Sequence, residues 1–389
     1  MNNLCTDIGY YSLNKFGEQL CGDHVDVAQG SESAIVVLAD GLKSGVKASI
    51  LSTLTAKILS TLLEGGLELE ECVRTIAATL PVSKEHGVAY STFSVIRIIE
   101  NREAELIVYD NPHIILLRDG KRYEFPKTIL EIDGKTIYLA KMPIKLGDIF
   151  IALSDGAIGA GPGKALNPNW KRENIADFME MVADGDFTAK TLATMLMGEC
   201  DKLYEGHPAD DTTACIVKVR ERNQVNLMIG PPSRREDEKA MMSLFFSKAG
   251  KHIVCGGTTS HLAADYLGVP LDTSTDYLDP EIPPTSKIAG VDLVTEGAIT
   301  INRVLSYAQN YLEDNQRYAE WSYKPDGASQ IARMLFEEAT DIDFYVGRAV
   351  NSAHQQEGSP VNSTIKMRLV AELAECLKKM GKRIKVSYF

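Results

Sequence analysis

The spacing of apolar and polar residues divides this chain into two parts. Up to about residue 220, short strand-like runs prevail, and the run 34–39 is continuously apolar, as is typical of a strand buried on both faces. The runs 92–99 and 104–109, on either side of Asn101, predict a hairpin. The other predicted strands of this part are residues 8–12, 114–117, 136–139, 148–153 and 213–219.

Helical spacing interrupts these strands. Apolar residues recur every three to four positions from Val46 to Leu62, with Ser44 as the predicted N-cap and Gly65-Gly66 as the end. Further helices are predicted at 68–80, 172–182 and 188–204. Because strands and helices come in blocks, residues 1–222 are expected to form a layered α+β domain.

After a charged exit at residues 220–224, the pattern changes to strands that alternate with helices. The predicted strands are 225–229, 252–255, 291–294, 342–346 and 384–388, and the predicted helices are 261–267, 298–313 and 363–380. Such alternation predicts a smaller α/β domain with parallel strands over residues 225–389. Its role is open, with ligand binding or regulation as the hypothesis.

Composition narrows the class of protein. The 389 residues are 44% hydrophobic and carry a formal net charge of −12, which argues against a nucleic-acid partner because phosphate contacts need a basic face. Seven scattered cysteines without a Cys-x-x-Cys pair indicate reduced thiols. The N-terminus shows no secretory signal, and no apolar run approaches the ~20 residues of a membrane span. We therefore expect a cytoplasmic protein without a membrane partner.

Four short acidic motifs carry the candidate chemistry. They are Gly22-Asp23, Ala39-Asp40-Gly41, Ser154-Asp155-Gly156 and Asp210-Asp211-Thr212-Thr213. Most of them adjoin a strand-like run, although any one of them alone reads as an ordinary turn. Together they suggest one cluster of carboxylates, which are the ligands that Mg²⁺ and Mn²⁺ prefer.

The order and strand context of these motifs resemble the metal-dependent Ser/Thr protein phosphatase family (protein phosphatase 2C or PPM), in its bacterial sporulation-stage-II-E-like branch. Tyr90-Ser91-Thr92-Phe93 and Asn111-Pro112-His113 resemble intermediate features of the same family. The resemblance covers residues 1 to about 220 and implies an α-β-β-α sandwich with two Mn²⁺ or Mg²⁺ ions at one edge. It also implies bacterial signal transduction by hydrolysis of phosphoserine or phosphothreonine on a protein substrate, with metal-activated water as the attacking group.

The resemblance assigns roles to individual residues. Asp40 is expected to bridge both ions, with the Gly41 carbonyl on one of them and Asp23 supporting the first. Asp155 and Asp210 are expected to hold the second ion, and Asp211 to support that site or replace a ligand. Asp40 and Asp155 are thus the principal catalytic candidates.

Two features depart from the family pattern. Leu42-Lys43-Ser44 stands where relatives carry small residues, so Lys43 is either a phosphate contact or a solvated loop lysine. No histidine is well placed as a general acid, since strand alternation directs His24 away from Asp23. These departures leave an alternative function open, a weak or inactive phosphatase-like signalling or scaffold protein whose second domain senses a ligand.

In the second part, Cys255-Gly256-Gly257-Thr258-Thr259-Ser260 lies between a predicted strand and a predicted helix. Such a turn can present backbone N–H groups to a small anionic ligand at Gly256–Ser260, or can be a capped glycine-rich turn without a ligand. It matches neither the dinucleotide fingerprint nor the P-loop. Thr295-Glu296-Gly297 repeats the same placement after the next predicted strand.

Overall fold

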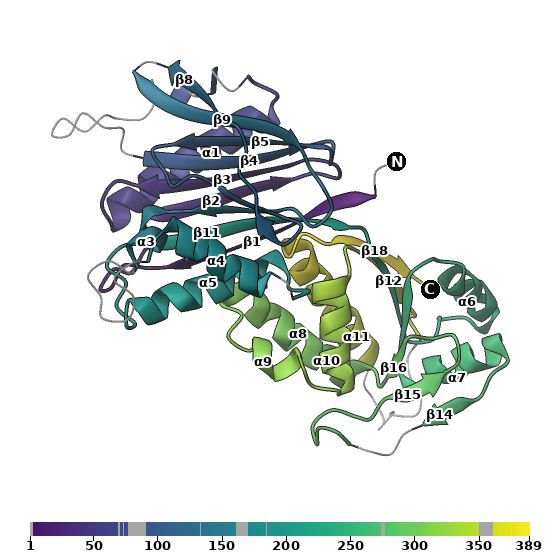
Figure 1. Ribbon diagram of the computed structural model, residues 1–389. Helices are drawn as coiled ribbons and strands as arrows, with labels where there is room; N and C mark the ends of the chain where they lie inside the picture. Colours follow the sequence, from purple (N-terminus) through teal and green to yellow (C-terminus); the bar gives the residue numbers. More distant parts are fainter. Residues whose placement is uncertain are drawn as a thin grey trace. The chain divides into compact units, whose positions relative to one another are not determined.

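The computed structural model describes residues 3–389 except 69–70, 73, 77–90, 133, 161–169, 184, 274–276 and 350–360. The chain forms two compact units, Met1–Glu221 and Arg222–Phe389. Each unit has its own sheets and its own hydrophobic core (Figure 1). The helix predicted at 68–80 lies partly outside the described residues.

The first unit contains two antiparallel sheets. Sheet A has the strand order β1 (Leu4–Leu13), β11 (Thr212–Glu221), β10 (Ile149–Leu153), β6 (Ile115–Arg118) and β7 (Lys121–Arg122). Sheet B has the order β2 (Asp23–Gln29), β3 (Ala34–Gly41), β4 (Ser91–Ile99), β5 (Glu103–Tyr109), β9 (Lys135–Pro143) and β8 (Thr128–Ile132). The β8 strand was not predicted from the sequence.

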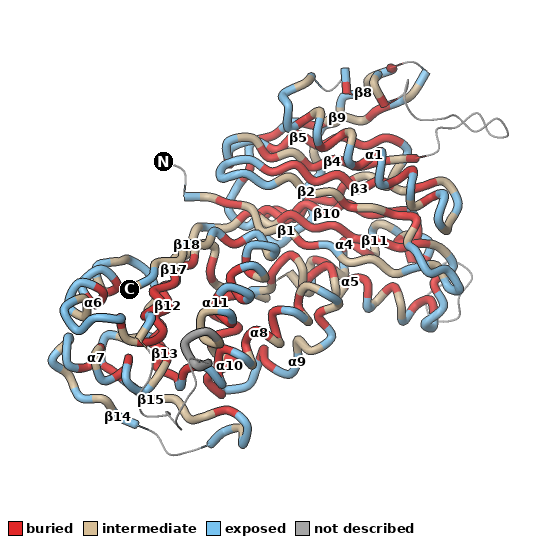
Figure 2. The backbone as a smooth tube through the Cα atoms, turned by 180° about the vertical axis from the view of Figure 1, so that it is seen from behind, coloured by how far each residue is buried: buried red, intermediate tan, exposed pale blue. Residues whose placement is uncertain are grey.

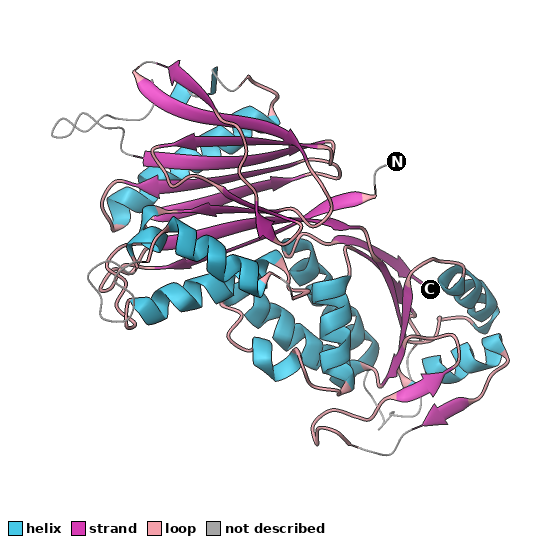
Figure 3. Ribbon diagram, in the orientation of Figure 1, coloured by secondary structure: helices cyan, strands magenta, loops and turns pink. Residues whose placement is uncertain are grey.

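The two sheets pack face to face, and helices cover their outer faces (Figure 3). Alternate residues of β3 serve different layers: Val36 and Leu38 join the core between the sheets, whereas Ile35 and Val37 face helix α1 (Val46–Glu64). Helices α4 (Arg172–Val182) and α5 (Ala189–Leu203) cover sheet A, and the short α3 (Asp155–Gly159) follows β10. The predicted α+β sandwich is confirmed.

Helix α1 starts differently from the prediction. Its N-cap is Gly45, not Ser44, and no side chain caps it, so the Ser44 prediction is wrong. The chain enters the helix through positive φ angles at Lys43 (71°) and Gly45 (82°), a tight turn that leaves Ser44 outside the cap position. Among the described residues, α1 is the helix whose length and apolar composition would allow it to cross a membrane. Its buried face packs on sheet B as part of the core.

A buried ion pair joins the ends of two strands in sheet A. The Arg118 guanidinium donates to both carboxylate oxygens of Asp148, at 2.8 and 2.7 Å, and to the Pro143 carbonyl at 2.9 Å. Arg118 is 8% exposed and Asp148 is fully buried. The bidentate geometry satisfies both charges, and this pair raises the pKa of Arg118. The pair fixes the turn between β9 and β10.

The second unit contains one seven-stranded sheet, called sheet C. Its order is β14 (Leu271–Thr273), β15 (Ser286–Ile288), β16 (Leu293–Thr295), β13 (Lys251–Cys255), β12 (Gln224–Ile229), β17 (Asp341–Val346) and β18 (Arg383–Tyr388). The five strands from β16 to β18 are parallel, as predicted, and the two edge strands β14 and β15 are antiparallel. β12 lies at the centre of the parallel strands. β13 and β16 follow it on one side, and β17 and β18 are added later on the other side.

Helices cover both faces of sheet C, as Figure 2 shows by the buried central strands. One face carries α6 (Glu238–Phe246) and α7 (Gly257–Leu267). The other carries α8 (Ala298–Glu313), α10 (Gly327–Ala332), the π-helical turn Arg333–Glu338 and α11 (Val361–Lys379). The short α9 (Tyr318–Trp321) lies between α8 and α10, and a 3-10 turn, Arg235–Asp237, precedes α6. Sequence reasoning missed α6, α9 and α10.

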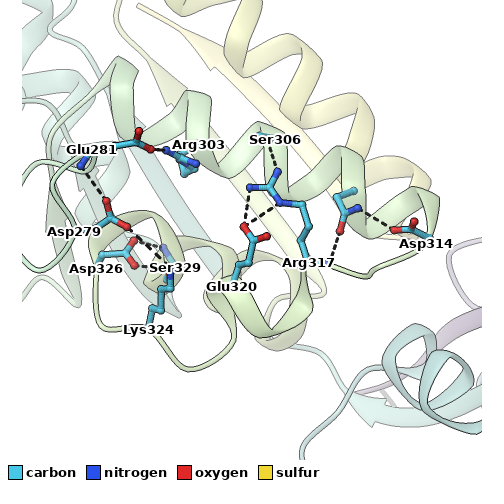
Figure 4. Close-up of polar contacts among 11 residues, drawn as sticks. Asp279, Glu281, Arg303, Ser306, Asp314, Arg317, Glu320, Lys324, Asp326 and Ser329 are labelled. Atoms are coloured by element: carbon cyan, nitrogen blue, oxygen red, sulfur yellow. Dashed lines mark hydrogen bonds and ion pairs between the residues drawn. The ribbon is translucent and has the colours of Figure 1, made fainter. Parts of the chain in front are cut away.

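Polar contacts fix the connection from α8 to α10 (Figure 4). Arg317 bonds to Glu320 at 2.8 Å and to the Ser306 hydroxyl of α8 at 2.9 Å. Asp326 caps α10 by accepting from the Ser329 amide at 2.9 Å and from its hydroxyl at 2.7 Å. Polar contacts thus hold this segment in place. Its sequence lacks the apolar periodicity from which a helix is usually predicted.

Replacing Asp148 with Ala should destabilise the first unit by about 3–5 kcal/mol, because the Arg118 charge would stay buried without a partner. The measurement is the urea midpoint of the first unit, followed by circular dichroism in the full chain. Glu199→Ala is the matched control, since it removes a surface pair with Lys202 that contributes roughly 0–1 kcal/mol. Equal midpoints for the two variants would contradict this account of the ion pair.

Candidate functional site

Strand ends from both sheets of the sandwich line one acidic pocket. Asp40 and Gly41 end β3, Asp155 follows β10, and Asp210 precedes β11. The complete set of lining residues is Asp40, Gly41, Leu42, Lys43, Ser91, Thr92, Asp110, Asp155 and Asp210. The structure therefore brings Asp40, Gly41, Lys43, Asp155 and Asp210, which were predicted from separate motifs, into a single site.

Strand pairing places Asp23 beside Asp40. The two residues are direct partners in the antiparallel β2–β3 ladder, so their side chains share the face that looks toward sheet A. Asp23 is 6% exposed, and its carboxylate oxygens have no partner in normal hydrogen-bond geometry among the described residues, although the adjacent Ser154 and Thr213 side chains lower its pKa against the effect of burial. An unpaired buried carboxylate is costly, so this position calls for a cation or a proton.

Asp210 and Asp211 differ in their surroundings. Asp210 accepts from the Asp211 amide at 3.1 Å and lies 3.7 Å from the Lys15 ammonium, with about half of its side chain exposed. Asp211 is 3% exposed and accepts from the Lys15 amide at 3.0 Å through Oδ1. Its Oδ2 is buried without a partner among the residues that the structure describes. Asp211 thus lies behind the pocket and does not line it.

Glycines allow this close approach. A Cβ on Gly41 would lie 2.4 Å from the Ala48 carbonyl of α1, and one on Gly156 would lie 2.2 Å from the Asp211 carbonyl. A Cβ on Gly22 would lie 2.7 Å from Asp211 Oδ2. The glycine beside each of three acidic motifs is therefore required by packing, in addition to any turn.

The carboxylates perturb one another. Burial, followed by the charges of Asp23, Asp155 and Asp210, raises the pKa of Asp40. Burial is also the main cause of the raised pKa values of Asp23 and Asp155. Asp40 and Asp155 interact directly through their carboxyl groups. Without a cation, these acids tend to keep protons, first because burial disfavours their charged form and then because their negative charges repel one another.

The donor set suits a hard divalent cation. It consists of carboxylates, one backbone carbonyl and orphaned carboxylate oxygens at Asp23 and Asp211. Within the described part of the chain, no group of three or more His, Cys, Asp or Glu side chains is arranged to hold a metal ion by itself. Mg²⁺ does not require such a group, because it retains several waters and binds through one or two carboxylates.

Sequence reasoning missed Asp110 as a contributor to the pocket, and it named Ser91 and Thr92 only as features of the family, without a role in the site. Asp110 lines the pocket directly after β5, in a left-handed turn with φ 51°. Thr92, the register partner of Asp40, also lines it and donates to Asn111 Oδ1 at 2.7 Å. Ser91 donates to the Asp40 carbonyl at 3.0 Å. Asp110 could have been found, since it ends an apolar run as the other aspartates do.

The two nearby histidines do not line the acidic pocket. His24 pairs with Ala39 on the β2–β3 ladder and shares the α1 side of sheet B with Asp26 and Lys57. His113 packs edge-on against Tyr138, with ring centroids 4.6 Å apart. No histidine is among the described residues that line this pocket.

Residues 30–220 match the family model described as Stage II sporulation protein E (SpoIIE). This part of the chain is therefore similar to the SpoIIE family. A curated relative, Stage II sporulation protein E of Bacillus subtilis strain 168, is 26% identical over 212 residues. That alignment covers 53% of this chain but only 24% of the relative, so the chain spans about a quarter of that protein's length.

Solved structures similar to the chain include phosphatase domains. A structure of the PP2C phosphatase domain and a fragment of the regulatory domain of SpoIIE from Bacillus subtilis is 20% identical, with a TM-score of 0.48 and coverage of 57% of this chain and 64% of that one. The RsbU and RsbW domains of Rv1364c from Mycobacterium tuberculosis are 16% identical, with a TM-score of 0.48 and coverage of 62% and 70%. The catalytic domain of the serine/threonine phosphatase PstP with two manganese ions is 18% identical, with a TM-score of 0.40 and coverage of 56% and 100%.

In EDTA, the first unit should lose stability as the pH rises from about 4 to 8. The folded-state pKa values of Asp23, Asp40 and Asp155 are raised above the ordinary 3.8, so the folded state holds more protons than the unfolded state in this window. Asp40→Asn should flatten this dependence and raise the metal-free Tm at pH 8 by about 2–4 °C per kcal/mol of repulsion relieved.

Differential scanning calorimetry at pH 5 and pH 8 gives the measurement. Asp186→Asn is the control, because the Asp186 side chain is 99% exposed. A wild-type Tm that rises with pH in EDTA, or an Asp40→Asn curve parallel to that of the wild type, would refute the assigned charge repulsion.

Proposed function

We propose that the first unit hydrolyses phosphoserine or phosphothreonine on a protein substrate with the help of two Mn²⁺ or Mg²⁺ ions. The observation that carries this proposal is the pocket in which Asp40, Gly41, Asp155 and Asp210 converge from both sheets. The orphaned oxygens of Asp23 and Asp211 behind it add to the demand for positive charge. The family match over residues 30–220 supports the same assignment.

Asp40, the Gly41 carbonyl, Asp155 and Asp210 would hold the ions, and Asp23 and Asp211 would support them from buried positions. When bound, divalent ions supply Lewis-acid activation of water and neutralise charge on a phosphoryl group. Asp40 and Asp155, whose carboxyl groups contact each other in the pocket, are placed to orient the attacking water. No covalent bond between enzyme and phosphate is required.

Lys43 lines the same pocket and is held there by a left-handed backbone conformation. Its ammonium is suited to contact the phosphoryl oxygens of the substrate as a point charge. Lys43→Met should therefore raise KM more than it lowers kcat. The neighbouring Lys47 of α1, replaced in the same way, is the matched control, because it is exposed and does not line the pocket.

The remaining assignments follow from the acidic chemistry and the family. The substrate is proposed to be a phosphorylated bacterial signalling protein, and the location is proposed to be the cytoplasm. The competing function is a weak or inactive phosphatase-like scaffold, for which Leu42-Lys43-Ser44 in place of small residues is the motivating feature. Calorimetric titration with Mn²⁺ separates the two, since a scaffold would show poor metal binding or no turnover.

Asp40→Asn should lower Mn²⁺-dependent hydrolysis of a phosphoserine peptide by about 10³-fold or more, because loss of metal-based charge stabilisation is worth several kcal/mol. Asp155→Asn should act in the same direction, and Asp186→Asn should retain activity. Phosphate release is the readout, with Mn²⁺ titration of each folded variant alongside. Undiminished hydrolysis by Asp40→Asn would disprove the metal assignment, and absence of hydrolysis by the wild type would favour the scaffold.

A further inference from the structure

A second pocket lies at the carboxyl ends of the parallel strands of sheet C. It is lined by residues that follow β12, β13, β16 and β17, and by two residues of α11. After β12 the chain turns to one face of the sheet, and after β17 it turns to the other, so the pocket includes the point where the winding reverses. Open α/β sheets characteristically bind ligands at such a point.

Two helix N-termini meet at this pocket. The four lining residues Gly256–Thr259 include the N-cap and first turn of α7, and Gly297, Ala298 and Ile299 begin α8. A Cβ on Gly297 would lie 3.5 Å from Gly256 Cα, so the two termini are adjacent. No side chain caps either helix. Their first backbone N–H groups and the positive ends of their dipoles therefore converge on one space.

The predicted glycine-rich turn is, in fact, the start of α7. Sequence reasoning placed Gly256–Ser260 before a helix that began near His261, and this boundary is wrong, because α7 begins at Gly257. Gly256 alone forms the turn, with φ 104°, and its amide donates to the Thr295 carbonyl at 2.9 Å. Its neighbour Cys255 is fully buried, and burial raises the pKa of its thiol to about 12, so it does not act as a nucleophile.

Two side chains add independent evidence for a ligand. Thr259 is 1% exposed and lines the pocket, yet its hydroxyl makes no hydrogen bond to another described residue. Lys366 of α11 lines the opposite wall, and its ammonium donates to the Gly347 carbonyl. Among the described residues, no carboxylate pairs with Lys366, and burial lowers its pKa. A buried hydroxyl and an unneutralised ammonium facing one cavity call for an anion that can accept hydrogen bonds.

The rest of the wall limits the kind of anion. Ile229, Pro231, Ile299 and Ile365 give it an apolar side, and exposed Glu296 is its one carboxylate among the described lining residues. Such a wall suits a ligand with a partly apolar body and hydroxyl groups in addition to its charge. The cavity of about 270 Å³ lies just below the ~300–1,000 Å³ of typical small-molecule sites. A ligand of mononucleotide size fits this volume.

We propose that this pocket binds a small phosphate-bearing molecule, with its phosphate between the N-termini of α7 and α8 and the Lys366 ammonium. Inorganic pyrophosphate and a mononucleotide share the recognised group, and the nucleotide adds the hydroxylated, partly apolar body. The site is independent of the metal-dependent chemistry proposed for the first unit. It gives the second unit a binding role of its own.

The test is isothermal titration of the full chain in EDTA, in the Asp40→Asn background, so that the acidic pocket of the first unit does not contribute. The probes are pyrophosphate, AMP and ATP, with adenosine as the uncharged control. Binding of AMP or ATP but not adenosine supports a nucleotide site, and binding of pyrophosphate alone supports a site for the phosphate group. If none of the charged probes binds at millimolar concentration, or if adenosine binds as well as AMP, the proposal is overturned.

Two variants locate the binding. Lys366→Met should weaken it about tenfold or more, and Lys379→Met, on the exposed face of the same helix, should leave it unchanged. Gly257→Asp should abolish it, because a Cβ at Gly257 meets no other atom within 4 Å and the added carboxylate repels phosphate. An aspartate in the first turn of a helix favours the fold, so loss of binding with an unchanged Tm is expected. Binding that withstands both variants would place the ligand elsewhere and overturn the proposal.

Discussion

Mutual repulsion among buried carboxylates is the constraint on which the first unit depends. Asp23, Asp40 and Asp155 are held together by strands whose registers are fixed by the hydrophobic core, so the acids cannot move apart without disturbing the packing. The arrangement is electrostatically unfavourable. It is stabilised by the hydrophobic core, by the close packing at the glycines beside the motifs and by the contacts of Lys15. The proposed binding of a cation would offset this electrostatic cost and would thereby stabilise the folded unit.

The second unit gathers positive charge, and not negative charge, at one place. Two uncapped helix N-termini and Lys366 concentrate positive potential at the carboxyl ends of sheet C. The first unit holds acids at the ends of antiparallel strands, whereas the second presents amides and an ammonium at the ends of parallel ones. The two proposed sites thus differ in the sign of the charge that they would bind, and they lie on sheets of different topology.

Many of the strands and helices could be predicted from the sequence, because a strand buried on both faces is a continuous apolar run that ends in a recognisable turn. The run 34–39 and the hairpin at Asn101 were predicted on this basis, and α4 and α8 have the predicted bounds. Asp110 was not predicted, because it precedes Asn111-Pro112-His113 and carries no glycine after it, unlike Asp40 and Asp155. Ser44 was wrong as an N-cap, because a left-handed Lys43 moves the helix start to Gly45, and local propensity does not encode that turn.

Other errors have a tertiary origin. Gly257, Thr258, Thr259 and Ser260 are weak helix formers, so their sequence favours a turn, yet packing on β13 and β16 makes them the first turn of α7. The short edge strands β14 and β15 and the helix α9 are too brief for a periodic signal. Convergence of the acidic motifs could only be inferred by resemblance, since spacing along the chain does not report which strand ends meet.

The in-register pairing of Asp23 with Asp40 has a consequence for how this sequence can change. The connection between β2 and β3 is only residues 30–33, closed by a hydrogen bond from the Gly30 amide to the Ser33 carbonyl. If the turn did not accommodate a single-residue insertion there, the register of one strand would shift by one residue. Its aspartate would then point to the face of the sheet that the helix covers. The hairpin length therefore sets the spacing of the two acids, and natural variants of this domain should vary in that turn's composition far more freely than in its length.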